Sequence, residues 1–423
     1  MKDNNITSTQ NEAFEKEYCD TLNRLGNDNR MLKGLRWFLD TAYNRAYNNT
    51  ECTDSKSVVI LGTSVPEELV IAAGAEPQWI IGGSLASTVW SDELVPRDTD
   101  PVSRSVLGYI NRPDGSGFSD TLFIIPLVSD SMRKIAYELK SEGRNICLLD
   151  IPPDRNDTYS VQKYAKQMKA MCSAVSEHTK ARVTRRSLVS AMKLISAARR
   201  SLHRFLEVSR GRTDIITDAA RLFVRNSYYM TSSIVEWTRR LEVLTGEIEF
   251  YAVRMKNNER NRPCIMLLGS PVIFPNYKIP FLTRESGLAI CDTADYITLK
   301  TNIVYGESAM RGRRDRLIEN IAEKWYAYDS SPSFVKNDVL FGYVSWIIQK
   351  GYTEGIIYHV LKGQIEYDFE LERFENMLAE YGIPVFRLET DYQYQDVEQL
   401  RIRMEAFSEM LVQRRYREVR RAS

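Results

Sequence analysis

The stretch SVVILGTSVPEELVIAAGAEPQWIIGG, residues 57–83, decides the fold that this sequence can adopt. It opens with a β-branched run that ends at Gly62, which is the pattern of a short buried strand. A helical segment follows from Pro66, and its first turn carries two acidic residues, which favour the positive end of the helix dipole. Gly74 closes this helix, and EPQWIIGG begins a second strand. The stretch therefore predicts a strand–helix–strand unit, which is the building block of a parallel sheet.

Two more strands with a helix between them extend this unit. TLFIIPLV (121–128) and NICLLDIP (145–152) have the length and apolar content of buried strands, and SMRKIAYELKSEG lies between them. Ligands of such doubly wound lobes bind at the carboxyl ends of the strands. In this lobe those ends are Gly62-Thr63-Ser64, Ser129-Asp130-Ser131 and Asp150-Ile151-Pro152-Pro153.

The second half of the chain repeats this pattern after a helical segment without strand signals. Strand patterns return at PCIMLLGSP (263–271), LAICDTA (288–294), GIIYHVL (355–361) and IPVFRLE (383–389). We therefore predict the α/β class, with two doubly wound parallel-sheet lobes of Rossmann or flavodoxin type. The expected divisions are N-terminal helices at 1–56, a first α/β lobe at 57–157, a helical segment at 158–255, a second α/β lobe at 256–393 and a C-terminal helix at 394–423.

The charge balance gives no reason to expect a nucleic-acid partner, since 57 basic residues face 56 acidic ones. Basic residues are dense from Lys180 to Arg212, but no aromatic residues are interleaved with them, so we expect a solvated helix face there. The N-terminal stretch MKDNNITSTQNEAFEKEY has no apolar core of the kind that signal peptides carry. No apolar run reaches the roughly 18 residues that a membrane span needs. We expect a cytoplasmic protein with no membrane partner.

The six cysteines are far apart and form no C-x-x-C pair or Cys/His cluster, so the usual zinc spacings are absent. Without a secretion signal we expect six reduced thiols, most of them buried. They are Cys19, Cys52, Cys147, Cys172, Cys264 and Cys291.

Candidate catalytic residues cluster after the first strand. Ser64 places a hydroxyl at a strand end, where it can donate a hydrogen bond to a carbonyl or phosphate, although no histidine nearby in sequence offers a base. Glu67 and Glu68 are paired carboxylates on a first helical turn, so one of them could act as a general base if the preceding loop faces the cleft. Compensation of the helix dipole is the alternative role for this pair.

Four aspartates also fall at predicted strand ends, where they could hold Mg²⁺ through water or cap the helices that follow. They are Asp130, Asp150, Asp292 and Asp295.

Several stretches resemble one known family in their order and spacing, over roughly residues 35–415. They are GTSVPEELVIAAGAEP, DPVSRSVLGYI, TLFIIPLVSDSMRKIAYEL, LLDIPPD, RPCIMLLGSP, EGIIYHVLKGQIEYDFE, YGIPVFRLETD and RIRMEAFSEML. The chain is similar to subunits of 2-hydroxyacyl-CoA dehydratase and benzoyl-CoA reductase, including the 2-hydroxyglutaryl-CoA dehydratase D-component. The resemblance implies two α/β domains, paired subunits and a [4Fe–4S] cluster between the lobes. It also implies an ATP-driven activator that delivers one electron, and an acyl-CoA thioester as substrate.

The resemblance fails at the positions of the cluster ligands. The family's first ligand lies in Cys-Pro-x-x-[Arg/Lys]-Ser, and the corresponding residue is Asp100 in Asp-Pro-Val-Ser-Arg-Ser. The other two ligand positions carry Ser129 and Gln364. Because soft thiolates are what stabilise Fe–S clusters, we expect no metal and no cofactor, and a [4Fe–4S] cluster only if this altered site still holds one. A hydrogen bond between Gln364 and Asp100 would close the former cluster site.

Three functions remain open. The first is a cluster-free subunit with a structural or substrate-binding role, paired with a homologous, cluster-bearing subunit in a hetero- or homodimer. The second is a stand-alone acyl-CoA-binding protein or non-redox lyase. The third is an active dehydratase or reductase subunit with an atypically ligated cluster and an ATP-dependent activator. The residues expected to contact substrate are Ser64, Glu68, Arg104, Ser129 and Asp130.

Overall fold

The computed structural model of this protein describes residues 2–47, 57–113, 118, 120–257 and 261–422. The first sheet has the strand order β2-β1-β3-β4, and all its neighbouring strands are parallel. Its central strands β1 and β3 are buried along their whole length, which explains why both read as continuous apolar runs. The strands are β1 (Val58–Leu61), β2 (Pro77–Ile80), β3 (Leu122–Pro126) and β4 (Asn145–Leu149).

The second sheet repeats the first with the order β6-β5-β7-β8, again with parallel neighbours. In each lobe the chain reverses its winding direction at the two central strands, so the two lobes have equivalent switch points. This topology confirms the predicted fold class. The strands are β5 (Cys264–Gly269), β6 (Ala289–Ala294), β7 (Gly355–Leu361) and β8 (Val385–Thr390).

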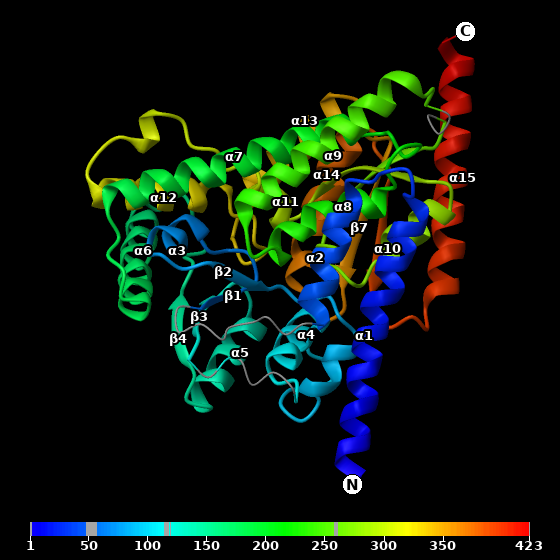
Figure 1. The fold of residues 1–423 in the computed structure, drawn as a ribbon. Coiled ribbons are helices and arrows are strands. Elements are labelled where there is room, and N and C mark those ends of the chain that lie inside the picture. Colours follow the sequence, from blue (N-terminus) through cyan, green and yellow to red (C-terminus); the bar gives the residue numbers. More distant parts are fainter. Residues whose placement is uncertain (1, 48–56, 114–117, 119, 258–260, 423) are drawn as a thin grey trace.

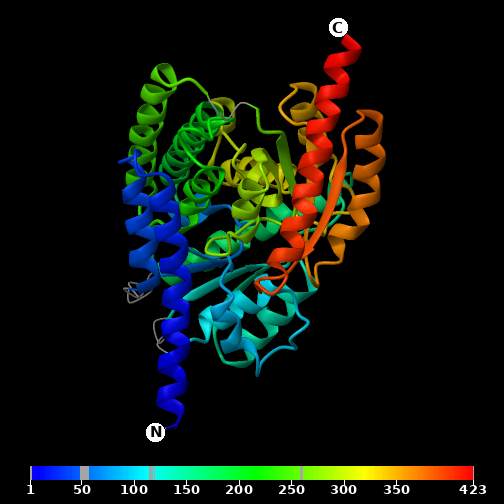
Figure 2. The same cartoon turned by 90° about the vertical axis from the view of Figure 1, so that its right-hand side faces the viewer.

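Helices surround both sheets, and the long helices of the middle segment lie across the upper part of the molecule, while α1 and α15 carry the two chain ends to opposite extremes (Figure 1; Figure 2). The α-helices are α1 (Lys2–Asp28), α2 (Leu35–Tyr47), α3 (Glu67–Ala72), α4 (Pro101–Ile110), α5 (Asp130–Ser141), α6 (Thr158–Thr179), α7 (Arg185–Ser209), α8 (Asp218–Asn226), α9 (Ile234–Arg254), α10 (Lys278–Glu285), α11 (Tyr296–Lys300), α12 (Arg314–Tyr328), α13 (Asp338–Gln349), α14 (Glu366–Glu380) and α15 (Val397–Ala422). Short 3₁₀ helices lie at η1 (Ala86–Ser91), η3 (Ser227–Met230) and η4 (Ser308–Met310).

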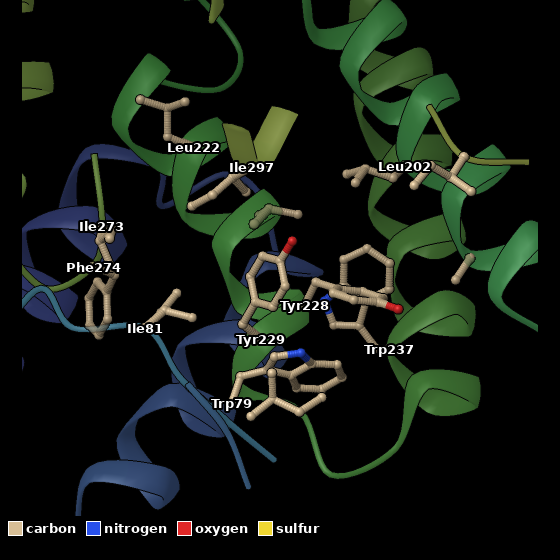
Figure 3. Packing of buried hydrophobic residues seen from close by; sticks show 14 of the residues in the cluster. Trp79, Ile81, Leu202, Leu222, Tyr228, Tyr229, Trp237, Ile273, Phe274 and Ile297 are labelled. Atoms are coloured by element: carbon tan, nitrogen blue, oxygen red, sulfur yellow. The ribbon is translucent and has the colours of Figure 1, made fainter. Parts of the chain in front are cut away.

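One continuous apolar core joins the two lobes through the helical segment. Figure 3 shows its aromatic part, where Trp79 of β2 meets Tyr228 and Tyr229 of η3 and Trp237 of α9. The ring centroids of Trp79 and Tyr228 are 5.6 Å apart, and those of Tyr228 and Trp237 are 5.2 Å apart. Such packing anchors the first sheet to the helical segment and so holds the strand ends of the first lobe in place.

The expectation of six separate thiols is wrong for one pair, because Cys264 on β5 and Cys291 on the neighbouring strand β6 form a disulfide. Parallel neighbouring strands bring together residues that are distant in sequence. Among the described residues Cys19, Cys147 and Cys172 form no disulfide, and burial raises the pKa of the Cys147 thiol to about 11. Cys52 lies outside the described residues.

Within the same described ranges, no helix is both long enough and apolar enough to cross a membrane.

Gly269, the last residue of β5, has a φ of +105°, and an added Cβ would lie 2.3 Å from the carbonyl oxygen of His359. We expect Gly269→Ala to lower the free energy of unfolding by about 3 kcal/mol, because both the backbone conformation and the close approach exclude a side chain. Gly246→Ala is the control, since nothing lies within 4 Å of its added Cβ on α9. That change should raise stability by roughly 0.5–1 kcal/mol. Urea unfolding measures both changes. Equal changes in the free energy of unfolding for Gly269→Ala and Gly246→Ala would contradict this prediction.

Candidate functional site

A cavity of about 60 Å³ lies between the two lobes, where the carboxyl ends of their strands meet. We call it the inter-lobe cavity. By volume it has room for a few water molecules. The polar side chains in its wall come from both lobes: Ser64, Asp100, Ser103, Ser129, Tyr296, Ser331, Gln364, Glu366 and Tyr367.

The three residues that the family resemblance assigns to ligand positions, Asp100, Ser129 and Gln364, all line this cavity. Asp100 and Ser129 are the N-cap residues of α4 and α5, respectively. The Asp100 Oδ1 atom accepts a hydrogen bond from the backbone N–H of Ser103 at 2.9 Å, and the Ser129 hydroxyl accepts one from Met132 at 3.2 Å. Both side chains therefore stabilise the starts of helices that the sheet directs at the cavity.

Gln364 bridges the two lobes across the cavity. Its Nε2 donates to the Asp100 Oδ1 atom at 3.5 Å, and its Oε1 accepts a hydrogen bond from the Ser270 hydroxyl at 2.8 Å. The hydrogen bond between Gln364 and Asp100 that the sequence suggested is present, at the long end of the hydrogen-bonding range.

This donor set does not fit a [4Fe–4S] cluster. A carboxylate, a hydroxyl and an amide are hard or neutral donors, whereas such clusters are held by cysteine thiolates. No cysteine is found among the described residues that line the cavity. All three side chains also have hydrogen-bond partners within the protein, so none of them is a vacant ligand.

Ser64 lines the cavity and is backed by a buried cation that the sequence did not indicate. The Lys300 Nζ atom donates to the Ser64 hydroxyl at 2.5 Å and to the Thr63 hydroxyl at 3.3 Å. Asp329 lies 3.5 Å from the same ammonium group. Burial lowers the pKa of Lys300, and the charge of Asp329 acts against this shift. With the ammonium group donating to its oxygen, the Ser64 hydroxyl is a strengthened hydrogen-bond donor, and its proton faces the Ser331 oxygen.

Ser331 completes this arrangement on the Asp329 side. Its hydroxyl donates to the Asp329 Oδ1 atom at 2.5 Å and lies 3.2 Å from the Ser64 hydroxyl. A closed loop of polar contacts thus joins the strand end of the first lobe to residues of the second half of the chain.

Glu67 and Glu68 are both buried but point away from the inter-lobe cavity, toward Arg199 of α7. The Arg199 guanidinium lies 2.7 Å from Glu67 and 3.2 Å from Glu68. Glu68 also accepts hydrogen bonds from the hydroxyl of Tyr305 and the indole N–H of Trp325, each at 3.0 Å. Burial, partly offset by Arg199, raises the pKa of Glu68 to about 7. The structure thus places this pair in a charged network behind the cavity.

Two other predicted substrate contacts also lie outside the inter-lobe cavity. Arg104 of α4 pairs with Asp92 at 2.5 Å and does not line the cavity. Asp130 is exposed in the first turn of α5, where it favours the positive end of the helix dipole. Of the four aspartates considered for Mg²⁺, Asp295 caps α11, with its carboxylate 2.7 Å from the N–H of Thr298. No group of three or more metal-binding side chains occurs in the part of the chain that the structure describes.

Four residues of this site were not predicted from the sequence: Lys300, Asp329, Ser331 and Glu366. Lys300 and Asp329 lie 236 or more residues after the hydroxyl that they support, and neither is part of a motif that points to it. Glu366, in the first turn of α14, lines the cavity, and its pKa is raised by burial and by the charges of Asp100 and Asp130. A carboxyl with a raised pKa in a cavity is a general-base candidate.

Comparison with known proteins agrees with the family resemblance that the sequence shows. Residues 63–411 match the protein family described as 2-hydroxyglutaryl-CoA dehydratase, D-component. That range includes Asp100, Ser129 and Gln364.

Three relatives are similar over most of their length. The (R)-phenyllactyl-CoA dehydratase beta subunit of Clostridium sporogenes is 22% identical over 400 residues, which cover 92% of this chain and 100% of that protein. The putative dehydratase subunit YjiM of Escherichia coli is 22% identical over 82% of this chain and 90% of its own. The (R)-2-hydroxyglutaryl-CoA dehydratase subunit beta of Acidaminococcus fermentans is 22% identical over 84% of this chain and 92% of its own.

Proposed function

This chain belongs to the 2-hydroxyglutaryl-CoA dehydratase D-component family, and we propose that it is a subunit of that family that has lost its [4Fe–4S] cluster. The observation that supports this proposal is the wall of the inter-lobe cavity, which contains Asp100, Ser129 and Gln364, the residues that the resemblance assigns to the ligand positions. Hard donors that are already hydrogen-bonded do not replace thiolates in such a cluster. The redox chemistry that this framework supports in its family is therefore not carried by this chain.

A chain of this kind works as the partner of a homologous subunit that bears the cluster. Support comes from the relatives, all three of which carry the word subunit in their names. In such a pair, this chain supplies structure and part of the substrate site, and we infer that the pair works in the cytoplasm. An ATP-dependent activator would then act on the partner subunit rather than on this chain.

The substrate role rests on Ser64 and the cation behind it. An acyl-CoA thioester that enters the inter-lobe cavity would place its carbonyl oxygen against the Ser64 hydroxyl, which Lys300 polarises from 2.5 Å. Negative charge that develops on that oxygen during reaction would be stabilised by this donor chain once the Ser64 hydroxyl turns from Ser331 to the substrate. Ser129 and Gln364 can provide further hydrogen bonds in the same cavity.

Anaerobic purification of the native protein, with iron and acid-labile sulfide analysis, tests this function. We expect a homologous second subunit to co-purify, and iron to follow that subunit when the two are separated. This chain alone should contain no iron, because its cavity offers no thiolate. A solitary protein without a homologous partner would contradict the partner role, and about four irons on the isolated chain would contradict the loss of the cluster.

A stand-alone acyl-CoA-binding protein or non-redox lyase is the second candidate, and Glu366 is the observation that favours it. This carboxyl shares the inter-lobe cavity with Ser64, and its raised pKa suits a group that removes a proton next to a polarised thioester carbonyl. Calorimetric titration of the isolated chain with a panel of acyl-CoA thioesters separates the two candidates. Tight binding of an acyl-CoA thioester to the isolated chain, weakened by Ser64→Ala, favours the stand-alone protein. No binding to the chain without a partner subunit favours the cluster-free subunit.

A further inference from the structure

The wall of the inter-lobe cavity carries negative charge without positive charge. Two of its described lining residues, Asp100 and Glu366, are acidic, and none is basic. Lys300 and Asp329 lie behind Ser64 without lining the cavity, and their opposite charges are 3.5 Å apart, so this pair adds no net charge. The cluster-free subunit proposed above uses the Ser64 side of the cavity and leaves its acidic side without a role.

Neither of the two carboxylates is balanced by a cation of the chain. The Asp100 Oδ1 atom accepts hydrogen bonds from the backbone N–H of Ser103 and from the Gln364 amide, which are neutral donors. Within the described ranges, no basic side chain forms an ion pair with Asp100 or Glu366. Burial raises the pKa of Glu366, and the negative charges of Asp100 and of Asp130 on α5 raise it further. The charges that act on this carboxyl are therefore repulsive.

The Tyr367 hydroxyl is an independent sign of a ligand site. The side chain lines the cavity and is only 4% exposed, yet its hydroxyl has no hydrogen-bond partner among the described residues. A buried hydroxyl without a partner costs free energy, so such groups in native proteins bond to a ligand or to ordered water. Tyr367 follows Glu366 in the first turn of α14, so this turn presents both an acidic and a hydroxyl group to the cavity.

Another part of the wall is apolar. Val102 and Val106 of α4 and Met132 of α5 line the cavity beside the polar groups. The cavity volume of about 60 Å³ admits a group about as large as a few water molecules. A short aliphatic chain that ends in a charged group has this size and the same division into an apolar and a polar part.

We propose that the inter-lobe cavity binds a primary ammonium group on a short aliphatic chain. The ammonium group donates hydrogen bonds to the carboxylates of Asp100 and Glu366 and to the Tyr367 oxygen, which together use its three N–H donors. The chain lies against Val106 and Met132. A neutral or anionic ligand would leave both carboxylates without a counter-charge. Two sources share this chemistry: a free amine, and an acyl group with a terminal amine, the second of which rests on the proposed function.

Calorimetric titration of the full chain at constant ionic strength, with propylammonium, propan-1-ol, propanoate and potassium ions, tests the proposal. We expect propylammonium to bind at least tenfold more tightly than each of the others, because only propylammonium combines positive charge, three N–H donors and an alkyl chain. Propan-1-ol or potassium that binds as tightly as propylammonium would overturn the proposal. No binding of propylammonium at tens of millimolar would also overturn it.

The N-acetylcysteamine thioesters of 3-aminopropanoate and butanoate distinguish the two sources, since their acyl chains have the same length and differ in charge. A 3-aminopropanoyl thioester that binds more tightly than propylammonium identifies an acyl group, and the reverse order identifies a free amine. A butanoyl thioester that binds as tightly as the 3-aminopropanoyl thioester would overturn the ammonium site and leave the proposed substrate role standing. Binding of propylammonium alone, with neither thioester, would contradict that substrate role and support the ammonium site.

Two variants locate the amine with little risk to the fold. Glu366→Gln removes one of several repelling charges, and Tyr367→Phe removes a hydroxyl without a partner, so neither is expected to lower stability. We expect Glu366→Gln to weaken propylammonium binding at least tenfold and Tyr367→Phe to weaken it about fivefold. The matched controls Glu375→Gln and Tyr137→Phe change an exposed carboxylate of α14 and an exposed tyrosine outside the cavity, and should leave affinity unchanged. Binding that survives both cavity variants would place the amine elsewhere and overturn the proposal.

Discussion

Cysteines introduced together at Asp100, Ser129 and Gln364 are expected to turn a chain without iron into one that holds about four irons after anaerobic reconstitution. All three positions line the inter-lobe cavity, and the structure already places the side chains of Asp100 and Gln364 within hydrogen-bonding distance of each other. The change removes two helix N-caps, each of which stabilises the protein by about 1 kcal/mol, so the triple variant should be less stable but folded. Iron and sulfide analysis, with the absorption of the reconstituted protein, measures the gain.

The control is the variant Asp100→Ser/Ser129→Thr/Gln364→Ser, which changes the same positions without adding a thiol. It should contain no iron after the same reconstitution, because hydroxyl groups do not replace thiolates. Near-UV circular dichroism checks that both variants are folded. A folded triple-cysteine variant without iron would show that this cavity is not the former cluster site. Wild-type protein that takes up about four irons would show that the cluster was never lost.

Arg199→Met is expected to destabilise the protein by about 3–5 kcal/mol, because it leaves two buried carboxylates without their cation. Glu67 and Glu68 are 3% and 0% exposed, and Arg199 is the charged partner of both. The control is Arg204→Met on the same helix, whose partner Glu249 is solvent-exposed. Losing that exposed pair should change the free energy of unfolding by roughly 0.2–1 kcal/mol. Urea unfolding of the two variants at neutral pH gives the comparison.

Lower pH should reduce the loss of folding stability that Arg199→Met causes. Burial raises the pKa of Glu68 to about 7 even beside Arg199, and without the guanidinium the pKa of this carboxyl rises further. A carboxyl whose pKa is higher in the folded state than in the unfolded state favours folding at low pH, and this contribution is lost as pH rises through the folded pKa. The stability gap between variant and wild type should therefore narrow as pH falls from about 8 to about 5. A gap that stays constant over this range would show that the loss comes from packing rather than from unpaired charge.

The strand pattern could be predicted from sequence because buried parallel strands carry their signal locally. Runs such as those around Val58 and Ile356 are apolar on both faces, and glycines or prolines mark their ends. The assignment of Asp100, Ser129 and Gln364 to ligand positions rests on short stretches next to them that resemble the family, and it stays a prediction. The disulfide between Cys264 and Cys291 could not be predicted from the sequence, because the order of the strands in the sheet is not set by their spacing along the chain.

The sequence alone determined the α/β class and the two lobes, because both depend on local patterns of residues. Only the tertiary structure decided that Lys300 lies 2.5 Å from the Ser64 hydroxyl, and that Glu67 and Glu68 face Arg199 instead of the inter-lobe cavity. It also decided that Arg210, Arg225 and Lys350 line one cavity beside β6. These side chains meet because two sheets and the helices between them pack around one core, and that packing places residues together regardless of their separation in sequence.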